Sequence, residues 1–409
     1  MLAPEAAPAP EAAAAQAGAV PQGKAAPARR REPAESLGRR QREISVAEFF
    51  QKNRHLLGFD NPAKALLTAT KEAVDNSLDA CEEAGILPEI AVGIEELAED
   101  RFRLSITDNG PGIVRGQIPK VFGKLLYGSK FHILRQSRGQ QGIGISAAGM
   151  YAQLTTGQPI RITSRTGKKR PAHFFEIQID TTRNEPKVLT DREVPWDADH
   201  GTRVEMDIAG TYKKGRRSVD DYVVQTALAN PHATVHYRPP KGDELHRERL
   251  TSELPREPLA IRPHPYGVEL GVLISMLRDT RGRTLRGALQ QDFSRVSAKV
   301  AEEICRAAGL SPDVKPRSLG VAQAEALFRA IPKVRIMAPP TSTIVPIGEA
   351  LILEGLKQTL KADFYTSTTR PPAVYRGNPF IVEAGLAYGG ELPGEELIDL
   401  WRFANRVPL

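Results

Sequence analysis

The chain has 409 residues, of which 41% are hydrophobic and 26% are charged, and its formal net charge is +7. This length favours roughly two or three domains over a single core, and no apolar run approaches the about 18 residues that a membrane-spanning helix needs. Cys81 and Cys305 are too far apart to form a disulfide framework or a metal-ligand cluster, which fits a reducing, cytoplasmic setting.

Residues 1–42 are rich in Ala, Pro and Gly and contain no aromatic side chain. A segment of this composition cannot bury enough apolar surface to fold, so we expect a disordered extension. Prolines interrupt its apolar stretch, which argues against an export signal.

Residues 43–229 are predicted to form an α/β domain. Ser45 and Glu48 form a capping box before a first helix, and a second helix is expected over residues 62–84, before Gly85. The further expected elements are strands over 90–94 and 101–107, a helix over 145–152, strands over 160–164, 174–179 and 202–208, and a helix over 219–228. Helices combined with a mixed sheet predict a two-layer α/β sandwich.

Two smaller domains are predicted beyond this sandwich, over residues 230–330 and 331–409. Proline clusters mark a linker, and short helices follow it, one with Ser297 as its N-cap and Gly309 at its end. In the last domain we expect a strand over 334–337, a helix over 348–360, strands over 373–375 and 380–382, and a final helix near 397–403.

One face of the second predicted helix carries polar side chains at a chemically useful spacing. Glu72 and Asn76 are four positions apart, so the carboxylate and the amide lie on one face, with Asp79 beside them. The opposite face is apolar, so the helix can bury one stripe and offer the other to a ligand. The residues of that apolar face are Leu66, Leu67, Ala73, Val74, Leu78 and Cys81.

Two glycine-containing motifs follow this helix. Asp108 is delivered to the end of a predicted strand, just before Gly110 and Gly112, and residues 139–144 read Gly-Gln-Gln-Gly-Ile-Gly. Each motif alone is an ordinary turn or loop. No phosphate-binding loop of the G-x-x-x-x-G-K-[ST] type is present, and no G-x-G-x-x-G opens an early βαβ unit.

The order and spacing of the three motifs resemble the GHKL ATPases, which include gyrase B subunits, heat-shock chaperones, MutL proteins and histidine kinases. The resemblance implies that Glu72 is the general base for the attacking water and that Asn76 binds Mg²⁺. Asp108 would accept a hydrogen bond from adenine, with Thr202 supporting it through water. The implied ATP-binding residues are Asn76, Asp108, Ser129, Lys130, Arg138, Gly139, Gln140, Gln141, Gly142, Ile143, Gly144, Ile145 and Thr202.

Longer strings resemble the B subunits of topoisomerase VI, a type IIB DNA topoisomerase, from about Glu43 onwards. They include residues 125–130, 230–233, 337–340, 369–380 and 402–409. The resemblance implies an α+β chain composed of a GHKL (Bergerat) two-layer α/β sandwich, a helix-two-turns-helix domain and an α/β transducer domain with a left-handed βαβ crossover. It also implies ATP and Mg²⁺ as cofactors, dimerisation on ATP binding, and an A₂B₂ assembly in which the A subunit cleaves double-stranded DNA.

The positive net charge favours a polyanionic partner, although so modest an excess is also compatible with a solubility feature. The candidate DNA contacts form what we call the basic loop, which comprises Lys213, Lys214, Arg216 and Arg217. Contacts to phosphates would be independent of sequence and sensitive to salt. We expect the protein at the nucleoid rather than at a membrane.

Two alternatives to a topoisomerase subunit remain open at this level. A histidine kinase would share Asn76, Asp108 and the glycines, but no histidine precedes His55 to act as its phosphoacceptor. A nucleotide-gated clamp without topoisomerase activity is the other reading. The family's transducer continues beyond the string that ends here at Leu409 and supplies a lysine to the γ-phosphate, so we expect either a fragment or a truncated gene.

Overall fold

The computed structural model describes residues 43–128, 136, 138, 143–394 and 398–409. Within these residues an eight-stranded sheet has the order β5-β4-β3-β6-β2-β1-β7-β8. All neighbouring strands in it are antiparallel except β1 and β7. The strands are β1 Glu89–Ala98, β2 Arg101–Asp108, β3 Ile160–Arg165, β4 Ala172–Asp180, β5 Glu185–Val194, β6 Gly201–Ala209, β7 Thr234–Arg238 and β8 Leu245–Arg247.

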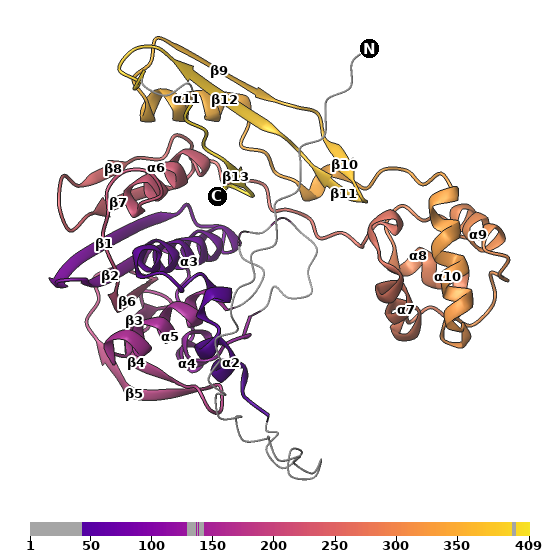
Figure 1. The fold of residues 1–409 in the computed structure, drawn as a ribbon, viewed down its shortest axis with the longest axis horizontal. Helices are drawn as coiled ribbons and strands as arrows, with labels where there is room; N and C mark the ends of the chain where they lie inside the picture. Colours follow the sequence, from indigo (N-terminus) through magenta and orange to yellow (C-terminus); the bar gives the residue numbers. More distant parts are fainter. Residues whose placement is uncertain (1–42, 129–135, 137, 139–142, 395–397) are drawn as a thin grey trace, which may run out of the picture. The chain divides into compact units, whose positions relative to one another are not determined.

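A layer of helices covers one face of this sheet (Figure 1). The helices are α2 Val46–Lys52, α3 Pro62–Glu83, α4 Ile118–Gly123, α5 Gly144–Thr156 and α6 Val219–Ala229. Packing of α3 on β1, β2 and β6, and of α5 on β3, β4 and β6, encloses the main hydrophobic core. The two-layer α/β sandwich is thereby confirmed.

Helix α3 shows how the sequence specifies a long element. Asn61 caps its first turn by accepting a hydrogen bond from the backbone N–H of Ala63 at 2.9 Å, and Pro62 has the fixed φ that a first helical position needs. The chain leaves the helix at Gly85, whose φ is +71°. The predicted apolar face is buried except for Leu67, which is half-buried.

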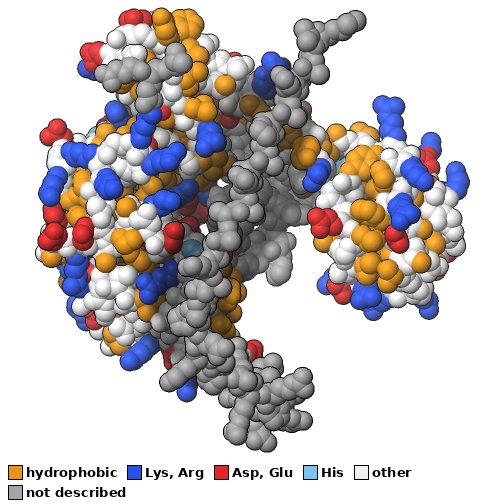
Figure 2. Space-filling view, in the orientation of Figure 1, with side chains coloured by type: hydrophobic (Ala, Val, Ile, Leu, Met, Phe, Trp, Pro, Cys, Tyr) orange, Lys and Arg blue, Asp and Glu red, His pale blue; other side chains and the backbone are white. Residues whose placement is uncertain are grey.

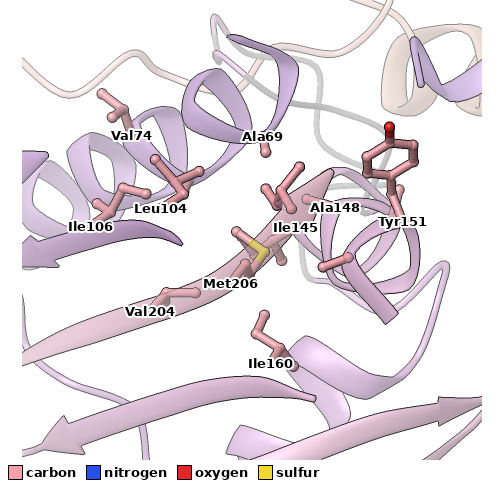
Figure 3. Close-up of a cluster of buried hydrophobic side chains, with 14 of the residues drawn as sticks. Ala69, Val74, Leu104, Ile106, Ile145, Ala148, Tyr151, Ile160, Val204 and Met206 are labelled. Carbon is pink, nitrogen blue, oxygen red and sulfur yellow. The ribbon is translucent and has the colours of Figure 1, made fainter. Parts of the chain in front are cut away.

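The core between α3, α5 and the sheet is continuous (Figure 3). Leu104 and Ile106 point from β2 towards Val74 of α3, and β6 contributes Met206 to the same cluster. Each such fully buried aliphatic side chain stabilises the fold by roughly 1.5–3 kcal/mol. The strand predicted over 101–107 is therefore confirmed; buried residues alternate along it, and the core fixes the side of β2 that faces α3.

The short helices that follow the sheet have a separate core. They are α7 Leu270–Asp279, α8 Leu285–Asp292, α9 Ala298–Ala307 and α10 Val321–Ala330. Leu273, Leu289, Ile304 and Leu327 from the four helices meet in one buried cluster. Ser297 caps α9 through its hydroxyl, as predicted.

The remaining elements belong to the last part of the chain. They are α11 Glu349–Thr359, β9 Phe364–Thr369, β10 Ala373–Tyr375, β11 Asn378–Phe380, β12 Glu383–Tyr388, β13 Phe403–Ala404 and β14 Val407–Pro408. The strand pairs are β9–β12, β10–β11 and β13–β14, all antiparallel. A βαβ crossover needs a parallel pair, which the described residues of this part do not contain, so the left-handed crossover stays a prediction.

The strand predicted over residues 334–337 is wrong. Its backbone groups bond to side chains instead of a neighbouring strand: Tyr266 donates its hydroxyl proton to the carbonyl of Val334 and accepts from the N–H of Ile336, and His264 contacts the carbonyl of Met337. These contacts satisfy the segment locally, so no ladder forms.

The final helix predicted near 397–403 is also wrong for the residues described there. Residues 398–402 are not helical, and β13 and β14 form a hairpin. Asn405 and Arg406, at the turn, have φ values of 52° and 67°. Two successive residues with positive φ make the type of tight turn that suits a hairpin, and they are incompatible with a right-handed helix.

The two cysteines, Cys81 and Cys305, are free and buried, as expected from their separation in the sequence. None of the helices described has the length and apolarity that a bilayer crossing requires.

Candidate functional site

The candidate site begins with a row of polar side chains across three strands. Asp108 ends β2 opposite Thr202 of β6, and Thr202 lies opposite Ser164 of β3. Residues opposite one another in antiparallel strands face the same side of the sheet, so the register alone brings these three together. The hydroxyls of Ser164 and Thr202 are 3.0 Å apart.

Three donors hold the Asp108 carboxylate. The backbone N–H groups of Gly110 and Thr202 donate to Oδ1 at 2.9 and 3.2 Å, and the Ser77 hydroxyl of α3 donates to Oδ2 at 2.9 Å. Burial raises the pKa of Asp108, and these hydrogen bonds oppose that effect. A carboxylate offers about four acceptor positions, so room remains for one further donor.

Glycines are required around Asp108 because other chain segments approach closely. Gly112 has a φ of +71°, and a Cβ there would overlap the carbonyl oxygen of Arg165. A Cβ on Gly110 would lie 2.9 Å from Asp108 Oδ1. The next residue, Asn109, serves the fold: its side chain bonds the backbone N–H of Glu89 and the carbonyl of Leu87.

Glu72 lies on α3 against the N-terminus of α5. A Cβ built on Gly144, the first residue of α5, would overlap the Glu72 carboxylate. Burial raises the pKa of Glu72, with the charge of Lys71 acting against it, so this carboxylate is a stronger base than an exposed one. Asn76, one turn along α3, is exposed.

The start of α5 is a second feature of the site. The first N–H groups of a helix have no intrahelical partner and carry a partial positive charge, which suits an anion. Ile143, the N-cap residue, makes no side-chain cap, and the side chains of Ile143 and Ile145 are buried in the core. The structure therefore brings one carboxylate and one helix N-terminus to the same place.

Arg138 is buried against the C-terminal half of α3. Its guanidinium, with a side chain 5% exposed, donates to Asp79 at 2.7 Å, to Glu82 at 2.6 and 2.9 Å, and to Asn230 Oδ1 at 2.6 Å. His232 reaches Glu82 at 2.6 Å from the other side. Nothing local to the Asn230-Pro231-His232 string indicates this contact, so the sequence could not assign it a role.

Several predicted positions lie outside the described residues. They are Ser129, Lys130, Gly139, Gln140, Gln141 and Gly142. The nucleotide roles of all the candidate residues stay predictions. Ser77, which bonds Asp108, is not among the predicted site residues. Its position directly after Asn76, on a helix predicted to offer one face to a ligand, was a signal that could have found it.

The basic loop is exposed at all four of its cationic residues. Arg216 forms an ion pair with Asp399 at 3.2 Å, and the backbone N–H of Arg217 donates to Asp221 at 2.9 Å. On the face drawn in Figure 2, Lys and Arg side chains are scattered among acidic and apolar ones. The loop's role as a DNA contact stays a prediction.

Two family profiles match the chain. The profile of the histidine kinase-, DNA gyrase B- and HSP90-like ATPases matches residues 61–183, and that of the topoisomerase VI B subunit transducer matches residues 339–409. The B subunit of type 2 DNA topoisomerase 6 from Natronomonas pharaonis is 35% identical over 561 residues, with 92% of this chain and 70% of that protein covered. The chain belongs to the topoisomerase VI B-subunit family.

Other B subunits are more similar in sequence. That of Methanosarcina barkeri is 53% identical over 377 residues, and that of Archaeoglobus fulgidus 50% over 371 residues. The chain spans 61% of the length of each of these two relatives. The ATPase domain of Aquifex aeolicus MutL, solved in complex with ADP, covers 44% of this chain at 20% identity with a TM-score of 0.30, too low to argue from.

Membership of the family accounts for the sandwich and for the last part of the chain. The sandwich has the GHKL ATPase fold, a nucleotide-binding fold, and the transducer is present in the last part of the chain. β7 and β8 extend the sheet of the B-subunit sandwich to Arg247, beyond the residue 229 at which the sequence placed its end.

Proposed function

We propose that this chain is the ATP-binding part of a topoisomerase VI B subunit, and that it binds ATP with Mg²⁺ between α3, α5 and the end of β2. The observation that carries the proposal is the meeting of the Glu72 carboxylate with the α5 N-terminus at Gly144. A carboxylate that can accept a proton beside an anion-binding helix end suits hydrolysis of a phosphoanhydride.

Each residue has a distinct task in this proposal. Asp108, fixed by its three donors, accepts a hydrogen bond from the adenine amino group with its remaining acceptor position. The α5 N-terminus binds phosphate oxygens through its backbone N–H groups. Glu72 accepts a proton from the attacking water, and its burial-raised pKa makes it a better acceptor.

The donor set fits magnesium held mainly by phosphate oxygens. No group of three His, Cys, Asp or Glu side chains in the described part of the chain could hold a metal alone. Asn76 is exposed on the Glu72 face and offers one neutral oxygen, as suits an ion that keeps several waters and binds phosphates. Bound magnesium would neutralise phosphate charge.

We further propose the organisation and partners of the whole machine. The domains are an extension over 1–42, the ATP-binding domain from 43, a helix-two-turns-helix domain up to 330, and the transducer from 331; the sheet supports extending the second of these from 229 to Arg247. ATP binding would dimerise two such chains around DNA, and the A subunits would cleave and rejoin one duplex so that a second can pass through it, which relaxes supercoils and decatenates DNA. The basic loop would contact phosphates of the DNA.

The test of the proposed site is nucleotide affinity. A non-hydrolysable ATP analogue with Mg²⁺ should bind the chain, and Asp108→Asn should weaken it by about tenfold or more, since the amide cannot replace a carboxylate among three donors. Asp100→Asn, at the opposite end of β2, is the matched control. Equal affinity in Asp108→Asn and the control would remove Asp108 from the adenine site.

A second measurement separates binding from hydrolysis. Glu72→Gln should leave analogue binding within about threefold and abolish turnover, because a general base contributes about 10²–10⁴ in rate. Glu83→Gln, an exposed position on α3, is the control. Turnover that survives in Glu72→Gln would exclude Glu72 as the base, and binding without turnover in the parent chain would favour the nucleotide-gated clamp.

A further inference from the structure

A continuous set of polar contacts leads from Arg138 to the last strands of the transducer. Arg138 directly precedes the glycine-rich motif in sequence, and its guanidinium is buried on Asp79 and Glu82 of α3. Its second nitrogen also donates to Asn230 Oδ1 at 2.6 Å. The helix that supplies its two carboxylates is the one that carries Glu72.

Asn230 connects Arg138 to the β13–β14 hairpin by hydrogen bonds. Its side chain is fully buried, and its Nδ2 donates to the carbonyl of Thr226 at 2.9 Å and to that of Arg406 at 3.3 Å. The Arg406 guanidinium then donates to the carbonyls of Val345 and Pro346, each at 3.2 Å. The side-chain amide of Asn230 thus bonds both the guanidinium of Arg138 and the turn of the hairpin.

A second path joins the same segments. The backbone N–H of Val345 donates to Gln136 Oε1 at 2.8 Å, so Val345 is bound by Gln136 through its N–H and by Arg406 through its carbonyl. Lys71, next to Glu72, donates to the carbonyl of Pro408 in β14 at 2.8 Å. Residues 345–346 lie shortly before α11. Between them and α11, the backbone N–H groups of residues 347 and 348 donate to the carboxylate of Glu383 in β12.

Buried polar contacts of this kind depend strongly on the relative positions of the groups that make them. Well-packed apolar groups often stabilise a protein as much as a whole buried ion pair does, whereas removing one partner alone leaves an uncompensated buried charge and is costly. A guanidinium fork fits its carboxylates in one geometry, so displacement of Arg138 breaks the contacts rather than stretching them. The Asn230 amide has the same directional demand.

We propose that Arg138 and Asn230 are positioning residues that couple nucleotide binding beside the glycine-rich motif to the β13–β14 hairpin and to residues 345–346 of the transducer. The inference rests on the proposed function, because it presumes that a nucleotide binds at this site. Arg138 is assigned no contact with the nucleotide. Its effect is exerted through α3 and Asn230.

Trp401, two residues before β13, provides the reporter. The sequence contains two tryptophans, and Trp196→Phe leaves Trp401 as the sole one while keeping an aromatic ring for Arg203, whose guanidinium lies 5.8 Å from the Trp196 ring centre. In this background, emission of Trp401 is measured as a non-hydrolysable ATP analogue with Mg²⁺ is added to saturation. Affinity is measured in the same titration by a fluorescent analogue.

The variants are Arg138→Lys, which keeps the charge and loses the fork, and Asn230→Ala, with Arg402→Lys as an exposed control in the hairpin segment. Arg138→Lys and Asn230→Ala should each remove at least half of the Trp401 response at saturation and change affinity by about fivefold, the lower end of ordinary coupling. The double variant should add little, because both residues act in one path. Arg402→Lys should respond like the parent.

The outcomes separate the two ideas. A parent that binds no nucleotide overturns the proposed function and, with it, the coupling. A parent that binds nucleotide but shows no Trp401 response, or a full response in both variants at saturation, overturns the coupling alone. If a variant is unfolded by circular dichroism, Gln136→Ala takes its place: it removes only a neutral link to Val345, and an undiminished response in it counts against the proposal.

Discussion

The charge on Glu82 is predicted to stabilise the folded chain by about 3 kcal/mol at neutral pH. Glu82 accepts two hydrogen bonds from Arg138 and one from His232, and its side chain is 22% exposed. Glu82→Gln keeps the size of the side chain and removes the charge. Arg138 would then be left buried with one carboxylate, that of Asp79, instead of two.

The magnitude follows from the pKa of Glu82. Burial opposes its ionisation, but the hydrogen bonds from His232 and Arg138, with the charge of Arg138, outweigh burial and lower the pKa from 4.5 to about 2. At about 1.36 kcal/mol per pKa unit, this corresponds to roughly 3 kcal/mol. Removing one partner of a buried pair ordinarily costs about 3–5 kcal/mol, which agrees.

The pH dependence has a definite sign. Because the folded pKa is depressed, the stabilisation is complete above pH 4.5 and is lost as pH falls from there towards 2. It should be about 2 kcal/mol smaller at pH 3 than at pH 7. Burial also lowers the pKa of His232, against the contact with Glu82, so charging this imidazole destabilises the fold below its ordinary pKa of 6.5.

The assay is urea unfolding followed by Trp196, which lies in the loop before β6, in a Trp401→Phe background. Glu354→Gln, exposed on α11, is the control. Glu82→Gln should lower the unfolding free energy by about 3 kcal/mol at pH 7 relative to the control, and the difference should shrink as the pH approaches 3. A difference under about 0.5 kcal/mol at pH 7, or one that does not change with pH, would refute the ion-pair reasoning.

Three further predictions follow from the site. Gly144→Ala should reduce nucleotide turnover by about 10² or more by displacing the Glu72 carboxylate, whereas Gly116→Ala, which has open space around it, should leave turnover unchanged; equal turnover in both would place Glu72 away from the reaction. Gly112→Ala should lower the unfolding free energy by about 1–3 kcal/mol, measured by urea denaturation, and a stable variant would mean that the turn relaxes at no cost. Replacing the four cations of the basic loop by Gln should weaken duplex DNA binding and reduce its logarithmic salt dependence by up to about four, and an unchanged slope would exclude the loop from DNA contact.

Local sequence patterns predicted most elements of the sandwich. The cap at Ser45, the apolar stripe of α3 and the alternation in β2 are set by residues close in sequence, so each was readable without a structure. Strand β5 was missed because its burial pattern is mostly exposed, with no apolar alternation to reveal it. Its place comes from pairing with β4.

Two predicted elements of the last domain were wrong for a related reason. The segment over 334–337 has the apolar alternation of a strand, but its backbone is satisfied by Tyr266 and His264 from a distant stretch of chain. Residues near 400 have helix-like spacing, but Asn405 and Arg406 adopt positive φ. In both cases tertiary contacts or backbone geometry overrode a pattern that was present.

The sequence by itself determined which chemistry is available: Glu72 and Asn76 share a helical face because four residues make about one turn. It also determined the family, through strings too long to recur by chance. The tertiary structure alone decided that Gly144 abuts Glu72 and that Arg138 is buried on Glu82 and Asn230. These partners are separated by 56 to 92 residues, and only the packing of α5 and the chain after α6 against α3 brings such distant groups into contact.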